Sequence, residues 1–144
     1  MRLNDNGYDE LHKREGLRLK PYLCTQGVPT IAMGNTFYLD GKKVTMKDKP
    51  LTIREAYKLG RVTSDNFAKQ VNALLTKEVT QNQFNALVSL AYNIGINAFR
   101  KSTVLRRVNV NPNDPTIKNA FMMWTKNKEL IGRRKSEVEQ YFRK

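Results

Sequence analysis

The chain has 144 residues, and its 26 Lys and Arg against 13 Asp and Glu give a formal net charge of +13 at pH 7. That length suits a single domain with its own hydrophobic core, and no apolar run approaches the ~20 residues of a membrane-spanning helix. A single cysteine excludes an internal disulfide, and the one histidine has no Cys or His cluster around it, so we expect no bound metal and no cofactor.

The positive charge is concentrated near the C-terminus. Residues 100–144 hold twelve Lys and Arg against four Asp and Glu. A basic field attracts polyanions in general, so charge alone does not choose among nucleic acid, peptidoglycan, teichoic acid and lipopolysaccharide. The aromatic residues lie at spacings typical of a core instead of alternating with the cations, which argues against specific nucleic-acid binding.

The first predicted helix ends at an acidic residue. One face of it repeats at i, i+3, i+4 and i+7: Tyr8, Leu11, His12 and Glu15. Asparagine or aspartate at positions 4–6 can cap its start, and Gly16 is the residue expected just past its end. Burial and the negative end of a helix both disfavour a charged carboxylate, so Glu15 can stay a protonated acid that donates to a leaving-group oxygen. The alternative from spacing alone is a solvated Glu15 paired with Lys13 or Arg14.

The next segment predicts a small sheet followed by two helices. Residues 17–46 carry prolines and glycines at turn positions, and Asp40-Gly41 is a hairpin signal between two short extended segments. Thr52 and the glutamate three residues later form a capping box that opens a helix. A second helix is expected to start at Ser64 or Asp65.

The remainder of the chain predicts only helices. The strongest begins with a capping box of Thr80 and Gln83 and ends at Gly95. Shorter helices are expected from Ser102 to Val108, from an N-cap at Asp114, and after Gly132. This order of helix, small sheet and further helices indicates an α+β fold with segregated elements.

Three residues of the N-terminal part carry a family resemblance. Glu15, Cys24 and Thr30 are separated by eight and five residues, and this spacing resembles the Glu-x8-(Asp or Cys)-x5-Thr pattern of phage lysozymes, glycoside hydrolase family 24. Similarity continues in order along nearly the whole chain, in segments 14–22, 27–31, 80–89, 93–95, 98–99, 102–105, 120–121 and 132–134.

The resemblance implies a lysozyme-like α+β fold in one domain, residues 1–144. We expect a small N-terminal antiparallel sheet lobe over about 1–63 and a larger C-terminal helical lobe over about 78–144. A helix over about 64–77 joins them, and the active-site cleft lies between the lobes.

The resemblance also implies that Glu15 is the general acid of a glycosidase. Glycosidases usually pair this acid with a second carboxyl group, but Cys24 occupies the position where many relatives have Asp. We expect the Thr30 hydroxyl to hold a water on the sugar face opposite Glu15, with Cys24 assisting as a base, which implies inversion at the anomeric carbon. An ordinary thiol with a pKa of ~8.5 is mostly protonated at pH 7, and Lys20 is the nearby cation that would lower the pKa of Cys24. Taken without the family, Cys24 is a small buried residue and Thr30 an ordinary strand residue.

Substrate contacts are expected from the second half of the chain. Asn93 and Gly95 would face the cleft, and a side-chain amide suits an N-acetyl sugar because it both donates and accepts. Arg133 and Arg134 would begin the last helix and meet peptide carboxylates or sugar hydroxyls. The alternatives are a helix-capping Asn93 and solvated arginines.

One further departure from the family concerns a turn. Family members usually have Gly-Tyr-Gly-His where this chain has Ala32-Met33-Gly34-Asn35. A His–Asp pair that often braces the family's fold is therefore absent, and the expected substitute is a hydrogen bond from Asn35 to Asp65.

These features predict an endolysin: a muramidase that hydrolyses the β-1,4 bond between N-acetylmuramic acid and N-acetylglucosamine in peptidoglycan, for host cell lysis. A lytic transglycosylase is the alternative on the same bond, because it needs only one acid/base glutamate. A basic nucleic-acid-binding module and a non-catalytic wall-binding protein are alternatives from other classes. We expect a monomer whose basic C-terminal third also attracts anionic outer-membrane or wall polymers.

The N-terminus predicts where the protein is made. No apolar stretch of a signal peptide follows Met1. We expect the protein to stay in the host cytoplasm until a separate release route, such as a holin, lets it reach the wall in the periplasm.

Overall fold

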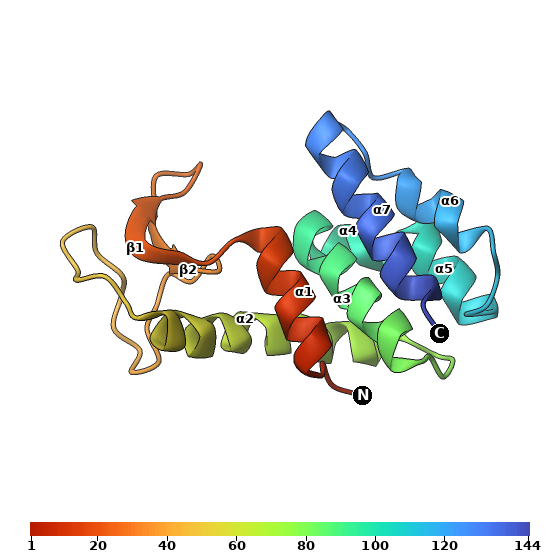
Figure 1. The fold of residues 1–144 in the computed structure, drawn as a ribbon, viewed down its shortest axis with the longest axis horizontal. Coiled ribbons are helices and arrows are strands. Elements are labelled where there is room, and N and C mark those ends of the chain that lie inside the picture. Colours follow the sequence, from red (N-terminus) through yellow and green to blue (C-terminus); the bar gives the residue numbers. More distant parts are fainter. The chain divides into compact units, whose positions relative to one another are not determined.

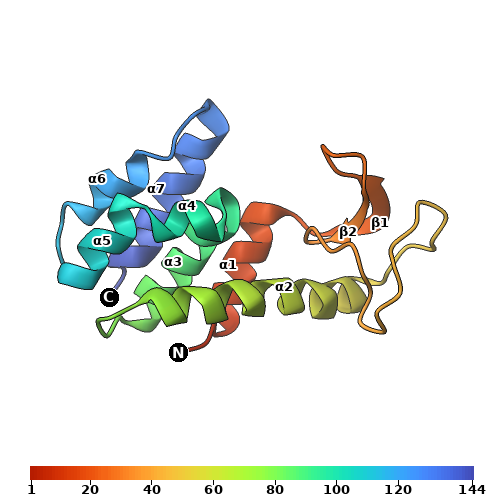
Figure 2. The same ribbon diagram turned by 180° about the vertical axis from the view of Figure 1, so that it is seen from behind.

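The computed structural model describes residues 1–144, which form seven α-helices and two β-strands (Figure 1; Figure 2 gives the reverse view). The chain divides into two compact units. The small unit is Tyr8–Asp65, and the helical unit is Met1–Gly7 together with Asn66–Lys144. None of the helices combines the length and the apolar character that crossing a membrane would require.

A two-stranded antiparallel sheet lies in the small unit. Strands β1 (Arg18–Leu23) and β2 (Pro29–Ala32) pair with Tyr22 opposite Thr30. The predicted antiparallel sheet is therefore confirmed, but its strands cover only part of residues 17–46. Beyond β2 the chain forms only isolated bridges, one of them between Phe37 and Lys43 around the expected Asp40-Gly41 turn.

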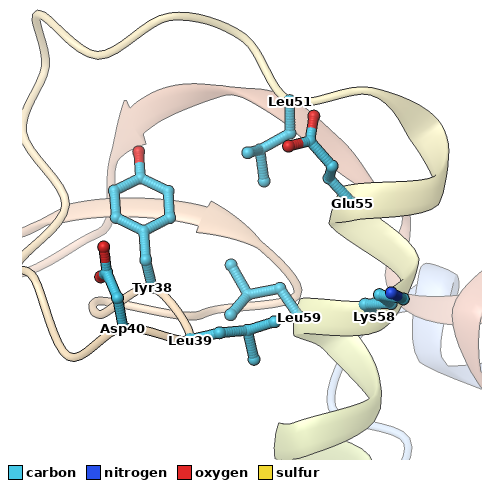
Figure 3. Close-up of a pocket in the computed structure, with 7 residues that line it drawn as sticks. All are labelled: Tyr38, Leu39, Asp40, Leu51, Glu55, Lys58 and Leu59. Carbon is cyan, nitrogen blue, oxygen red and sulfur yellow. The ribbon is translucent and has the colours of Figure 1, made fainter.

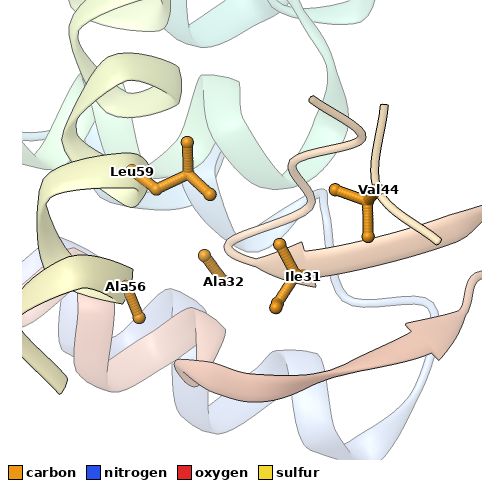
Figure 4. Packing of buried hydrophobic residues seen from close by; sticks show 5 residues of the cluster. All are labelled: Ile31, Ala32, Val44, Ala56 and Leu59. Carbon is orange, nitrogen blue, oxygen red and sulfur yellow. The ribbon is translucent and has the colours of Figure 1, made fainter. Parts of the chain in front are cut away.

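The core of the small unit joins the sheet to α2 (Ile53–Leu74). Leu59 and Ala56 lie three residues apart on α2, so both face the same side, and they pack with residues from β2 and the following loop (Figure 4). The buried members are Ile31, Ala32, Val44, Ala56 and Leu59. Tyr38 and Leu51 pack against this cluster from the loop that precedes α2.

The turn at the end of β2 contains the residues at which this chain departs from the family pattern, Ala32 to Asn35. Ala32 has a φ of 58°, the left-handed region where glycine is normally favoured. The amide of Asn35 closes the turn by accepting from the Met33 N–H at 3.2 Å and donating to Leu59 and Thr63 of α2 at 3.1 and 2.8 Å. The expected bond from Asn35 to Asp65 is wrong, because Asn35 donates to Leu59 and Thr63 instead, and Asp65 accepts from the Tyr8 hydroxyl.

Helix α2 is continuous, whereas the sequence suggested two helices. The capping box at its start is confirmed: Thr52 N–H donates to Glu55 at 2.9 Å, and Glu55 N–H donates to the Thr52 hydroxyl at 3.1 Å. The predicted second start is wrong, because the Ser64 hydroxyl donates back to the carbonyl oxygen of Gly60 at 3.0 Å instead of capping a new helix. The helix expected over 64–77 is thus the end of α2.

The helical unit is built around α3 (Gln81–Ile94). Nine consecutive residues of α3, from 83 to 91, are buried, and the predicted capping box of Thr80 and Gln83 is confirmed. Both views place α7 (Lys128–Phe142) alongside α3. The shorter helices α4 (Ile96–Arg100), α5 (Thr103–Val110) and α6 (Ile117–Met122) complete the unit.

Two predicted helix starts in this unit are wrong. Asp114 forms a turn instead of an N-cap, because its carboxylate accepts from the N–H and hydroxyl of Thr116 and α6 begins afterwards. Helix α7 begins four residues before Gly132, where the side chain of Asn127 accepts from the Leu130 N–H at 3.1 Å. The Ser102 cap of α5 is confirmed.

Candidate functional site

Glu15 is the last residue of α1 (Asp5–Glu15). Gly16 follows with a φ of 76°, and its N–H donates to the carbonyl oxygen of His12 at 2.9 Å, which ends the helix as expected. Leu11 and His12 are buried on the same face, while Glu15 is half-buried and its Oε2 is shielded from solvent. Glu15 therefore stands at the C-terminal end of α1, partly enclosed within the small unit.

Cys24 begins the turn that joins β1 to β2. Its N–H donates to the carbonyl oxygen of Val28 at 3.0 Å, and its own carbonyl oxygen accepts from the Gly27 N–H at 2.9 Å. The N–H of Val28, then that of Gln26, hydrogen-bonds the sulfur and lowers the pKa of the thiol below its ordinary value. The Thr30 hydroxyl adds a smaller effect in the same direction, and desolvation opposes it.

The expected influence of Lys20 on this thiol is not found. Lys20 is exposed on β1, and the pKa of Cys24 is lowered by hydrogen bonds instead of by that cation. Two main-chain N–H groups aimed at one side chain would stabilise a carboxylate as well as a thiolate. The turn therefore explains how position 24 can hold either residue of the family pattern.

Thr30 lies beside Cys24 and is only 3% exposed. Its hydroxyl donates to the carbonyl oxygen of Val28 at 2.8 Å. A hydroxyl has one hydrogen and two acceptor lone pairs, so while this bond is made Thr30 accepts from a water or from the Cys24 thiol. The structure thus brings two of the three predicted catalytic residues together in one hairpin, and Glu15 belongs to the same small unit.

Asn93 and Gly95 lie at the end of α3 in the helical unit. Asn93 is exposed, and its Oδ1 accepts from Nη2 of Arg134. Gly95 has a φ of 91°; its N–H donates to Ala91 and its carbonyl oxygen accepts from Phe99. This backbone conformation favours glycine where α3 ends and α4 begins. Gly95 therefore has a structural role that does not depend on contact with a substrate.

Arg133 and Arg134 lie inside α7 instead of at its start. Arg133 donates from Nε to Glu137 at 3.2 Å and from Nη2 to the carbonyl oxygen of Ser89 at 3.1 Å. Arg134 and Glu137 are fully buried and form an ion pair, and the Ser89 hydroxyl also donates to Glu137. Arg134 Nε donates to the carbonyl oxygen of Trp124 at 2.9 Å.

The sequence did not predict this buried network, which we call the α3–α7 network and define as Ser89, Asn93, Arg133, Arg134 and Glu137. A signal was present, because Arg133 and Arg134 precede Glu137 by four and three residues, the spacings at which helical side chains pair. Its burial depends on the packing of α3 and α7, which no local pattern reveals. Arg134 is thus not the solvated charge considered above.

No three His, Cys, Asp or Glu side chains lie close enough together to hold a metal ion. His12, the only histidine, is 5% exposed, and neither ring nitrogen has a hydrogen-bond partner. Its ring packs on that of Tyr57, with the centroids 4.4 Å apart. The imidazole is therefore part of the packing between α1 and α2 in the small unit.

Sequence comparison places this arrangement in a known family. Residues 12–137 match the family described as phage lysozyme. The chain belongs to the phage lysozyme family. An endolysin of Salmonella phage P22 is 36% identical over 126 residues, which cover 88% of this chain and 85% of that protein.

Solved structures of phage lysozymes agree with the fold. A mutant of P22 lysozyme matches with a TM-score of 0.88 at 34% identity, covering 98% of each chain. The muramidase domain of SpmX from Asticaccaulis excentricus matches with a TM-score of 0.81 at 33% identity, over 98% of this chain and 97% of that one. The predicted lysozyme-like α+β fold is confirmed, and this member of the phage lysozyme family is a glycoside hydrolase of the endolysin type.

Proposed function

We propose that the protein is a muramidase that hydrolyses the β-1,4 bond between N-acetylmuramic acid and N-acetylglucosamine in bacterial peptidoglycan, with Glu15 as general acid. The observation that carries this proposal is the position of Glu15 at the negative end of α1 with one carboxyl oxygen shielded from solvent. A carboxyl group in this position can donate a proton to the glycosidic oxygen as the bond breaks. The similarity to a protein named as a muramidase domain supports the choice of bond.

The attacking water is assigned to the β1–β2 hairpin. Thr30 accepts a hydrogen bond from this water through the lone pairs that its bond to Val28 leaves open. Cys24 assists, because its lowered pKa raises the fraction of thiolate that can take the water's proton. Attack from the face opposite Glu15 inverts the anomeric carbon.

Substrate binding is assigned to the helical unit. The Nδ2 group of the exposed Asn93 can donate to the carbonyl oxygen of an N-acetyl group, and Gly95 leaves room beside it for the sugar. The side chain of Arg133 is 10% exposed and is held by Glu137, so it would offer the substrate an oriented guanidinium edge. These contacts require no cofactor.

Lytic transglycosylase chemistry is the second candidate, and the absence of a carboxylate at position 24 favours it. In that reaction the C6 hydroxyl of the muramic acid displaces the leaving sugar, and no water enters. We propose hydrolysis because the Cys24–Thr30 pair supplies polar groups that a transglycosylase would not need.

The protein would work as an endolysin that is held in the host cytoplasm and reaches the wall through a separate release route. Wall peptidoglycan is its expected partner, and it would act as a monomer. The twelve cations of residues 100–144 would add attraction to anionic wall or outer-membrane polymers.

Digestion of purified peptidoglycan in ¹⁸O-labelled water tests the proposal. Mass spectrometry of the products should show reducing-end muropeptides that carry one ¹⁸O at the anomeric carbon. Unlabelled anhydro-muramic products would show that the protein is a lytic transglycosylase and not a hydrolase. Intact peptidoglycan after prolonged incubation would overturn the enzymatic proposal and leave a wall-binding protein.

A further inference from the structure

The small unit exposes large apolar side chains. Phe37, Leu39 and Ile53 are 53%, 64% and 67% exposed. Phe37 and Leu39 alternate with Tyr38, whose ring packs against the buried cluster and whose hydroxyl donates to Asp48 at 2.7 Å. Phe37 lies in a bridge with Lys43 and Leu39 lies in the turn that follows, and both side chains remain exposed.

Three cations accompany these side chains. Lys43 pairs with Phe37 in an antiparallel bridge, which places the two side chains on the same side. Arg54 directly follows Ile53 at the start of α2, and Lys58 lies one turn further along the helix. All three cations are exposed, and none of them forms an ion pair within the chain.

The carboxylates of the same segment do not neutralise these cations. Asp48 accepts from the hydroxyl and N–H of Thr45 as well as from Tyr38. Glu55 accepts from the Thr52 N–H and Asp40 from the Lys42 N–H. Between residues 37 and 61 there are seven Lys and Arg against these three acidic residues, so the segment is net positive.

Two adjacent hollows connect the apolar and cationic side chains. Leu39 and Lys58 line a cavity of about 430 Å³ (Figure 3). Its other lining residues are Tyr38, Asp40, Leu51, Glu55 and Leu59. Figure 3 shows Leu39 and Leu59 close to each other, with Lys58 next to Leu59 on the same turn of α2. Lys58 also lines a second hollow of about 500 Å³ with Ile53 and Arg54. Lys58 therefore lines both hollows and links Leu39 to Ile53 and Arg54.

We propose that this cationic-apolar patch, defined as Phe37, Leu39, Lys43, Ile53, Arg54 and Lys58, docks on the surface of an anionic phospholipid membrane. Apolar side chains can enter the boundary between headgroups and acyl chains while Lys and Arg contact lipid phosphates. A polysaccharide or nucleic-acid partner would use the cations but would leave Leu39 and Ile53 without a role, because aliphatic side chains do not stack on bases.

Membrane docking is a binding activity separate from the proposed cleavage of peptidoglycan. None of the six patch residues belongs to the set assigned to catalysis or sugar binding. A wall-degrading protein that is bound to the membrane surface stays close to the peptidoglycan. Its effective concentration at the substrate is therefore higher than that of the free protein.

Vesicle flotation with the full-length protein tests the proposal. Vesicles of phosphatidylcholine with an equal amount of phosphatidylglycerol should carry the native protein, and vesicles of phosphatidylcholine alone should carry much less. The triple variant Lys43→Gln, Arg54→Gln, Lys58→Gln should bind on the order of a hundredfold more weakly, since each cation near an anionic surface contributes roughly a fivefold gain in affinity. Phe37→Ser, Leu39→Ser, Ile53→Ser should also weaken binding.

A matched control separates the patch from net charge. Lys118→Gln, Lys126→Gln, Lys128→Gln removes the same charge from exposed positions of the helical unit and should keep most of the binding. All variants should still cleave soluble peptidoglycan fragments, which also shows that they fold. Equal losses in the two glutamine variants would overturn the proposal, because binding would then follow total charge. Native binding by the serine variant would also overturn it, because the surface would then be a general polyanion site.

Discussion

The hydroxyl of Thr30 donates its hydrogen to the carbonyl oxygen of Val28, 2.8 Å away. Because its one hydrogen is used in this bond, the Thr30 oxygen can only accept hydrogen bonds from other groups. A bound water can therefore donate one of the water's hydrogens to the Thr30 oxygen. The same carbonyl oxygen also accepts from the Cys24 N–H, so the hairpin holds Thr30 and Cys24 through a shared atom.

Removal of the Thr30 hydroxyl should therefore affect catalysis more than folding. We expect Thr30→Val to lower the rate of peptidoglycan cleavage by about 10²-fold or more, the usual contribution of a group that handles a proton or a water. The loss of stability should be only about 1 kcal/mol, because Val28 keeps its bond from Cys24. Thr30→Ser is the matched control and should keep most of the activity. A fully active Thr30→Val would remove Thr30 from the proposed mechanism.

The thiol of Cys24 should ionise at a lower pH than an ordinary cysteine. Hydrogen bonds from the Val28 and Gln26 N–H groups lower its pKa, so the rate of alkylation by iodoacetamide should rise at lower pH than for an ordinary cysteine. Alkylation with the pH profile of an ordinary cysteine would contradict the lowered pKa.

The turn around position 24 should also accept a carboxylate. Cys24→Asp places an oxygen where two N–H groups already point, so this variant should fold and cleave peptidoglycan at least as fast as the native protein. Cys24→Ala should lose less than about 10²-fold, because Thr30 still positions the water. An inactive Cys24→Asp with native stability would show that the thiol has a role that an anion cannot replace.

Stability should fall in mild acid because of His12. Burial is the largest cause of its lowered pKa, Arg61 acts in the same direction, and Asp9 opposes both. The folded state therefore binds the proton less well than the unfolded chain, whose histidine titrates near its ordinary value of 6.5. The penalty is absent above that pH and grows as the pH falls from 6.5 toward the folded pKa.

His12→Phe should flatten this pH dependence. The phenyl ring keeps the contact with Tyr57 and removes two buried nitrogens without partners, so the variant should be as stable as the native protein at pH 7 and more stable at pH 5. Urea unfolding at both pH values measures the difference. An equal pH dependence of the free energy of unfolding in both proteins would show that His12 is not the cause of the acid sensitivity.

The α3–α7 network should dominate the electrostatic stability of the helical unit. Glu137→Gln leaves the fully buried Arg134 without its carboxylate and should cost about 3–5 kcal/mol in the free energy of unfolding. The matched control is Glu139→Gln, which removes an ion pair with Arg143 whose side chains are 76% and 37% exposed and should cost less than about 1 kcal/mol. Similar costs at the two positions would contradict the burial of the network.

Local sequence signals predicted the elements that carry the proposed chemistry. Gly16, the Thr80–Gln83 box and Gly95 mark helix ends through main-chain requirements that a few neighbouring residues satisfy. The predictions for α2 and α7 were wrong because Ser64 and Gly132 resemble boundary residues, while both sit inside helices held in place by tertiary packing.

The rest of the site depends on contacts between distant segments. The bonds from Asn35 to α2 and from Ser89 to Glu137 span 24 to 48 residues of sequence, so no local pattern predicts them. The pKa of Cys24 shows the same limit on a smaller scale. Its sequence neighbours suggested Lys20 as the cause, whereas the folded turn presents the N–H groups of Val28 and Gln26.

The most direct test of the account is the rate at which Glu15→Gln cleaves purified peptidoglycan, with Glu129→Gln as a control on an exposed carboxylate. Glutamine keeps the size and polarity of the side chain but cannot donate the proton that the leaving sugar needs. The account predicts a loss of at least about 10²-fold for Glu15→Gln with an unchanged melting temperature, and native activity for Glu129→Gln. Cleavage by Glu15→Gln at the native rate would contradict the assignment of Glu15 as the general acid.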